Sequence, residues 1–219
     1  MSLGILGKKV GMTRVFDAEA GCMIPVTVVD VNGNELLQVK TTETDGYSAI
    51  QVAYDDQKER RVNLPERTHQ AKQGATGAKK LIKEFRFDND ADLPSKEEGH
   101  PGAALFEDGQ WVDVIGTTKG KGFQGNVKRH GHNGQPDGHG HMMHRRTGAI
   151  GAGSTPARVW KNQKMPGHDG TVRRTTQNLK IVQVRQEDGV LLISGSVPGH
   201  NGAYVTVRPA LKRLSLIHI

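Results

Sequence analysis

A long segment without leucine limits how this chain can fold. Residues 116–174 contain no leucine, 13 of the 28 glycines and only scattered large apolar side chains such as Phe123, Ile150 and Trp160. A segment of this composition cannot bury enough apolar surface to form a core of its own. The hydrophobic core must therefore come from the residues on either side of it.

The same segment carries the net positive charge of the chain. It contains 11 lysines and arginines and two acids, whereas the rest of the chain contains 19 basic and 21 acidic side chains. Lysine and arginine gain free energy by replacing the counterions condensed on a polyanion. A membrane surface is disfavoured, because so glycine-rich a segment will not form an amphipathic helix and carries no lipidation motif. The charge pattern therefore favours a nucleic acid as partner.

Short β-branched runs flank the basic segment and predict a mainly β protein. We expect a single antiparallel β-barrel domain over residues 1–213, with strands from both halves of the chain. Hairpin turns are predicted at Asn32-Gly33, Asp45-Gly46 and Asp188-Gly189. The strand-like runs are ILGKKVGMTRVF, MIPVTVVDV, LLQVKT, YSAIQVAY, QWVDVIG, LKIVQVRQ, VLLISGSV and AYVTVRPA.

Two insertions interrupt the predicted strands. The first, residues 65–101, contains ERTHQAK and AKKLIKEFRF and is expected to form two short helices separated near Gly74 and Gly77. The second, residues 116–174, is predicted to be a long extended basic loop that a partner orders. The last residues, 214–219, match a translated sequencing adapter, so we interpret them as a non-native tail.

Cysteine usage and hydropathy point to the cytoplasm. The single cysteine, Cys22, excludes a disulfide framework and favours a reducing compartment. It lies in an apolar run, so we expect a small buried side chain. The N-terminal residues lack the apolar region of a signal peptide, and no apolar run approaches the ~20 residues of a membrane span. A soluble intracellular protein is expected.

Motifs that would indicate catalysis or a cofactor are weak. Gly120, Gly122 and Gly125 spell G-x-G-x-x-G, but we expect no helix after them to hold a pyrophosphate. Six histidines crowd residues 130–168 without a cysteine or a carboxylate-supported ligand spacing, so we predict no metal site. Ser154 lies outside any G-x-S-x-G motif. We predict no enzyme, no cofactor and no small-molecule substrate, with a histidine-cluster metal-binding protein or a free-standing RNA-binding protein as the alternatives.

Basic residues of the segment occur in pairs and triplets with hardly any acids around them. A solvated charged surface would normally pair such residues with acids, so contact with RNA is favoured. Histidines and aromatic side chains among them can stack on bases. The basic candidates are Lys119, Lys121, Lys128, Arg129, Arg145, Arg146, Arg158, Lys161, Lys164, Arg173 and Arg174.

Several blocks of the sequence resemble a known family. LGKKVGMTRVF, VIGTTKGKGFQGNVKRHG, HRRTGAIGAGSTPARVWKNQKMPGH and SVPGHNGAYVTVRPALK are similar, in order, to the bacterial form of the large-subunit ribosomal protein L3 family. The resemblance runs from about Leu3 to Lys212. It implies a β-barrel of the translation-protein type, a small helical insertion and a long extension that enters the large-subunit (23S) rRNA toward the peptidyl transferase centre.

The resemblance also implies a role for each part of the extension. Residues 117–130 and 161–174 would form its base, and residues 141–158 its innermost part. The protein would support early subunit assembly beside neighbouring large-subunit proteins. Ala152 stands where some relatives carry an N-methylated glutamine, so that modification is not expected. The resemblance adds to the rRNA-binding candidates Phe123, Gln124, His130, His144, Ile150, Gly151, Trp160 and His168.

Overall fold

The computed structural model describes residues 3–17, 21–95 and 99–212. The chain divides into two compact units. The first unit runs up to Thr117 and resumes at Arg173, and the second comprises Thr118–Val172. The second unit is therefore inserted between two strands of the first.

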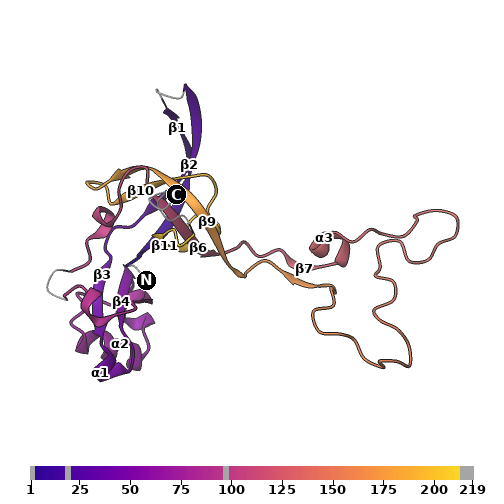
Figure 1. The fold of residues 1–219 in the computed structure, drawn as a ribbon, viewed down its shortest axis with the longest axis horizontal. Helices are drawn as coiled ribbons and strands as arrows, with labels where there is room; N and C mark the ends of the chain where they lie inside the picture. Colours follow the sequence, from indigo (N-terminus) through magenta and orange to yellow (C-terminus); the bar gives the residue numbers. More distant parts are fainter. Residues whose placement is uncertain (1–2, 18–20, 96–98, 213–219) are drawn as a thin grey trace, which may run out of the picture. The chain divides into compact units, whose positions relative to one another are not determined.

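Six strands of the first unit form a closed ring in which every neighbouring pair is antiparallel (Figure 1). The order around the ring is β1-β11-β6-β9-β10-β2, so both halves of the chain contribute. Closure leaves no free sheet edge in the ring. The predicted mainly β, antiparallel class is confirmed. The strands are β1 (Ile5–Asp17), β2 (Cys22–Asp30), β6 (Trp111–Thr117), β9 (Arg173–Arg185), β10 (Val190–Ser194) and β11 (Tyr204–Pro209).

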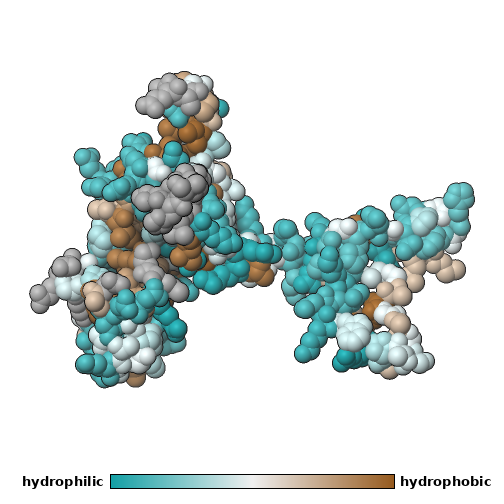
Figure 2. Space-filling view, viewed as in Figure 1, coloured by the Kyte–Doolittle hydropathy of each residue, from teal (hydrophilic) through white to brown (hydrophobic). Residues whose placement is uncertain are grey.

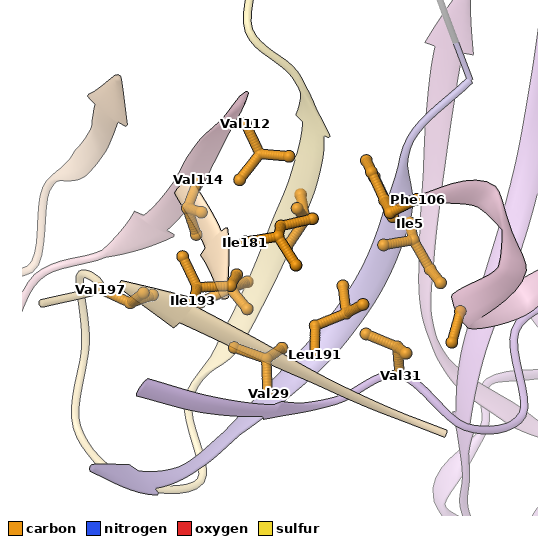
Figure 3. Packing of buried hydrophobic residues seen from close by; sticks show 13 residues of the cluster. Ile5, Val29, Val31, Phe106, Val112, Val114, Ile181, Leu191, Ile193 and Val197 are labelled. Atoms are coloured by element: carbon orange, nitrogen blue, oxygen red, sulfur yellow. The ribbon is translucent and has the colours of Figure 1, made fainter. Parts of the chain in front are cut away.

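The inside of the ring is filled by alternate residues of its strands. Val112 and Val114 of β6 point toward Ile181 of β9 and toward Leu191 and Ile193 of β10 (Figure 3). All five side chains are fully buried. This is the period-2 pattern of strands that place one face in a core. The β-branched runs at the two ends of the sequence therefore build one shared core.

A second sheet contains the strands of the first unit that do not join the ring. It consists of β3 (Glu35–Lys40), β4 (Ala49–Asp56) and β5 (Lys79–Arg86), in the order β3-β4-β5. Its buried Ile50 and Phe85 pack with Leu6 of β1. The prediction that every strand-like run belongs to one barrel is wrong for β3 and β4. The reason is that the start of β1 is buried on both faces, with Ile5 in the core of the ring and Leu6 in a second apolar cluster.

Only the first of the two helices predicted over residues 65–101 is present. ERTHQAK lies in α2 (Leu64–Lys72), whereas KKLIKEFR forms β5. Pairing with β4 along the whole strand overrides the helix-tolerant composition. Lys79, at the start of β5, is buried and ion-pairs with Glu35 and Asp56 at 3.2 and 2.9 Å. The short helical segments nearby are α1 (Thr42–Asp45), η1 (Glu59–Arg61), η2 (Asp90–Asp92) and η4 (Gly102–Leu105).

Two of the three predicted hairpin turns connect paired strands. Asp188-Gly189 joins β9 to β10, as predicted. Asp45-Gly46 lies between the paired β3 and β4, where Gly46 ends α1 in the left-handed conformation. Asn32-Gly33 connects β2 to β3, which pair with other strands, so this hairpin prediction is wrong.

The prediction of a buried thiol is also wrong, because Cys22 is exposed at the start of β2. The partner strand β11 pairs with β1 only as far as Lys8. Beyond that point β1 and β2 continue as a hairpin on which Met12, Phe16 and Met23 are exposed. The apolar run that contains Cys22 therefore begins outside the core. The predicted tail, residues 214–219, lies outside the described residues.

His100 links the chain before β1 to the turn before β6. Its Nε2 lies 3.1 Å from the carbonyl oxygen of Gly4, and its Nδ1 accepts the backbone N–H of Gly102 at 3.0 Å. A neutral ring fits both contacts, since it donates through Nε2 and accepts through Nδ1. Burial lowers the pKa of His100, and the hydrogen bond to Gly4 opposes this effect.

We expect His100 to make the first unit less stable in mild acid. The pKa of His100 is lower in the folded state than in the unfolded chain. The first unit therefore has its full free energy of unfolding above about pH 6.5, and this free energy falls as the pH decreases below that value. The loss should reach at most about 1.4 kcal/mol per pH unit. Urea unfolding at a series of pH values measures it. His100→Gln should weaken the pH dependence, and the exposed-site variant His200→Gln should retain it. Equal pH profiles for His100→Gln and the parent chain would contradict the prediction.

Candidate nucleic-acid interface

The two ends of the second unit are held together by a backbone ladder. Thr118 donates its N–H to the carbonyl of Val172 at 3.0 Å, and Lys121 donates to Asp169 at 2.9 Å. Further along, β7 (Gly122–Gln124) pairs with β8 (Gly167–Asp169), which places Phe123 opposite His168. The two rings make an edge-to-face contact with centroids 5.9 Å apart. The expectation of a segment without secondary structure is therefore wrong at this end.

Gly170 is required by the close approach of the two chains. A Cβ on Gly170 would lie 2.1 Å from the carbonyl oxygen of Lys119, and its φ is +77°. Only glycine adopts this conformation without strain and also leaves the space free. Part of the glycine content thus serves the unit's own folding.

A short helix follows the G-x-G-x-x-G motif, contrary to the sequence prediction. It is α3 (Asn126–His130), preceded by Gly125 in an extended conformation and ended by Gly131 in the left-handed conformation. Its last turn carries Lys128, Arg129 and His130, which the helix dipole favours at that end. A helix of this length is not stable alone, so its tertiary contacts must hold it. Sequence reasoning missed it because those contacts come from distant residues.

Asn126 is the centre of these tertiary contacts. It is 3% exposed, and its Nδ2 donates to the carbonyl of Lys164 at 3.1 Å and to the Thr147 hydroxyl oxygen at 2.5 Å. Arg129 and His130 add hydrogen bonds to the carbonyl of Met165 at 2.8 and 3.1 Å. One buried amide therefore joins α3 to two later parts of the unit. No sequence pattern indicates this role, because a single asparagine between a glycine and basic residues is typical of an exposed loop.

Asn126→Ala should loosen the second unit without affecting the first. Loss of buried hydrogen bonds that leaves partners unsatisfied costs about 1–3 kcal/mol. Amide exchange at Arg129 and Gly131, whose N–H groups close α3, should become roughly tenfold faster or more. Asn133→Ala, at an exposed position of the same unit, is the matched control. Unchanged exchange in Asn126→Ala would show that the amide does not hold the helix.

The cations of this unit are exposed and outnumber its acids. Residues 118–172 contain nine lysines and arginines and two acids. Asp169 ion-pairs with Lys121 at 3.1 Å, and this ammonium lowers the pKa of the Asp169 carboxyl. Asp137 lies 3.4 Å from Nδ1 of His144. Figure 2 shows a largely hydrophilic surface over the unit. The exposed predicted cations are Lys119, Lys121, Lys128, Arg129, Arg145, Arg146, Arg158, Lys161 and Lys164.

Flat and apolar side chains are exposed among these cations. Phe123 is 67% exposed, Trp160 59% and Ile150 46%. The guanidinium of Arg158 lies over the Trp160 ring, 4.3 Å from its centroid. Such a pair presents a charge and an aromatic face together, which suits a base and its phosphate. Gly151 and His168 are exposed, and Gln124 and His130 are half-buried.

The structure brings together some of the predicted residues but not others. Phe123 meets His168, and Arg158 meets Trp160. Arg129 and His130 of α3 both contact the carbonyl of Met165, next to Lys164, whose own carbonyl accepts from Asn126. Arg173 and Arg174 belong to the first unit, where β9 pairs them with Thr117 and Gly116 of β6.

The histidines do not form a metal centre in the described part of the chain. His130 and His132 have ring centroids 6.0 Å apart, but no group of three or more His, Cys, Asp or Glu side chains converges there. Among the described helices, none is long and apolar enough to cross a membrane. The exposed cations and aromatic rings can together bind a polyanion whose own flat groups stack on the rings.

Comparison with known proteins identifies the family. Residues 26–190 match the family model described as ribosomal protein L3. A large ribosomal subunit protein uL3 from Akkermansia muciniphila is 59% identical over 213 residues, covering 97% of this chain and all of that protein. The protein of the same name from Bordetella petrii is 49% identical and covers 96% of this chain and 90% of its own length. The one from Acholeplasma laidlawii is 48% identical, with 97% and 99% covered.

The chain belongs to the ribosomal protein L3 family. Its members are structural proteins of the ribosome and not enzymes. The resemblance inferred from the sequence blocks is thereby confirmed.

Proposed function

We propose that the chain is a structural component of the large ribosomal subunit in the bacterial cytoplasm and that it binds 23S rRNA. The observation that supports this most is the second unit, residues 118–172, whose nine exposed cations outnumber its two engaged acids. Arg173 and Arg174 extend the basic set onto β9. Lysines and arginines bind phosphates, while Phe123, Trp160 and His168 stack on unpaired bases.

In this proposal the two parts of the chain have different tasks. The closed ring is a β-barrel of the translation-protein type that docks on the subunit surface beside neighbouring large-subunit proteins. The basic segment, residues 116–174, enters the rRNA toward the peptidyl transferase centre, with Arg145, Arg146, Ile150, Gly151 and Arg158 innermost. Its glycines let the backbone pass between crowded RNA helices. Binding would complete its ordering, which supports a role early in subunit assembly.

A salt titration of binding to folded 23S rRNA tests the proposal. The logarithm of affinity should fall with the logarithm of salt concentration by about 0.7–0.9 for each phosphate neutralised, with a preference over unrelated RNA of equal length. Gradient sedimentation of cell extract should place the protein with the large subunit.

Two results would favour the alternative functions. A protein that binds RNA but sediments free of the subunit would be a separate RNA-binding regulator. A protein without salt-dependent RNA affinity that binds zinc or nickel in a 1:1 ratio would restore the histidine-based alternative.

A further inference from the structure

A basic cavity in the first unit is lined mostly by residues outside the predicted interface, with Arg173 as the exception. Its volume is about 280 Å³, below the usual range for sites of drug-sized ligands. Ile115, Thr206 and Arg208 line one side, on the outer face of β6 and β11. The edge strand β5 provides the other side. The cavity is lined by Lys83, Glu84, Phe85, Arg86, Ile115, Arg173, Thr206, Arg208 and Leu211.

The lining is positively charged and its acid is already engaged. The lining contains four basic residues and one acid, Glu84. The basic residues are Lys83, Arg86, Arg173 and Arg208. Glu84 ion-pairs with Lys40 at 2.8 Å and accepts hydrogen bonds from Tyr47 and Gln51. An anion in the cavity would therefore meet cations that Glu84 does not neutralise.

Arg208 has an unused donor at this site. Its Nη2 lies 3.8 Å from the buried carboxylate of Asp113, which also accepts backbone N–H groups from Asn178 and Leu211. The Nε of Arg208 is buried and has no hydrogen-bond partner within the described ranges 3–17, 21–95 and 99–212. A buried donor without a partner costs free energy that an acceptor on a ligand would recover. A guanidinium fork suits a phosphate oxygen in this position.

We propose that this cavity binds one phosphodiester group of RNA, with the adjoining sugar against Ile115, Phe85 and Leu211. The inference rests on the proposed function, since it makes the first unit a second contact for the same rRNA. Arg208 and Lys83 hold the phosphate oxygens, and Arg173 connects this site in sequence to the basic segment. RNA is favoured over an acidic protein segment because the site combines cations with an apolar floor that a sugar can cover.

Salt titrations with the full chain and folded 23S rRNA test the cavity. Arg208→Gln and Lys83→Gln should each lower the slope of log affinity against log salt by about 0.7–0.9, as expected for one lost phosphate contact. Arg185→Gln removes the same charge from an exposed position of β9 outside the cavity and should leave the slope unchanged. Arg208→Gln also removes a partner of Asp113, so its melting temperature is measured first. If that variant is unfolded, Lys83→Gln decides.

The outcomes separate the two proposals. If the parent chain binds 23S rRNA steeply with salt and both cavity variants keep its slope, the cavity proposal is overturned and the proposed function stands. If the parent chain shows no salt-dependent preference for this rRNA, the proposed function itself fails. If poly-L-glutamate binds the parent chain but not Lys83→Gln, and RNA slopes are equal, the occupant is an acidic protein segment and not RNA.

Discussion

Deletion of residues 120–164 should remove most of the salt-dependent affinity for 23S rRNA and leave the first unit folded. The deletion takes away eight lysines and arginines of the second unit. If most of them neutralise phosphates, the slope of log affinity against log salt falls by about 5 to 7. At moderate salt this corresponds to a loss of affinity of several orders of magnitude. The core of the ring contains no residue of the deleted segment, so cooperative unfolding should persist.

A full-length control separates charge from length. It carries glutamine at the eight lysine and arginine positions of residues 120–164, namely Lys121, Lys128, Arg129, Arg145, Arg146, Arg158, Lys161 and Lys164. We expect it to lose as much slope as the deletion does. Equal binding by the deletion and the parent chain would move rRNA recognition to the first unit. A deletion variant that cannot fold would show that the two units are not separable.

Leu191→Ala should cause a large loss of stability of the ring. Leu191 is fully buried in β10 and points into the shared core (Figure 3). Removing a buried leucine side chain typically costs about 2–5 kcal/mol, from lost transfer free energy and the cavity that remains. Urea unfolding followed by circular dichroism measures the change. Leu64→Ala, at a position 76% exposed, should change the free energy of unfolding by no more than about 0.5 kcal/mol.

A small effect at Leu191 would mean that the closed ring is not the stable core. A loss no larger than that of Leu64→Ala, about 0.5 kcal/mol, would be such a result. If Leu191→Ala loses the expected ~2–5 kcal/mol and the amide exchange of α3 is unchanged, the two units are independently stable.

The candidate interface was predictable in its charge and not in its internal order. Exposure of cations such as Arg145, Arg146 and Lys161 follows from a segment with few apolar residues, because nothing in it can bury them. The burial of Asn126 could not be foreseen, since its partners Thr147 and Lys164 are far away in sequence. The cavity around Arg208 was missed for the same reason, because its two sides come from β5 and β11.

The sequence alone determined the strand-forming runs, the Asp188-Gly189 hairpin and the separation of charge between the two parts of the chain. These features depend on residues that are neighbours in sequence, through period-2 alternation, turn chemistry and composition. Tertiary structure decided that KKLIKEFR is a strand, that β3 and β4 leave the ring, and that Cys22 is exposed. Each of these depends on which distant segment supplies hydrogen bonds and apolar contacts, and that choice is made by the fold as a whole.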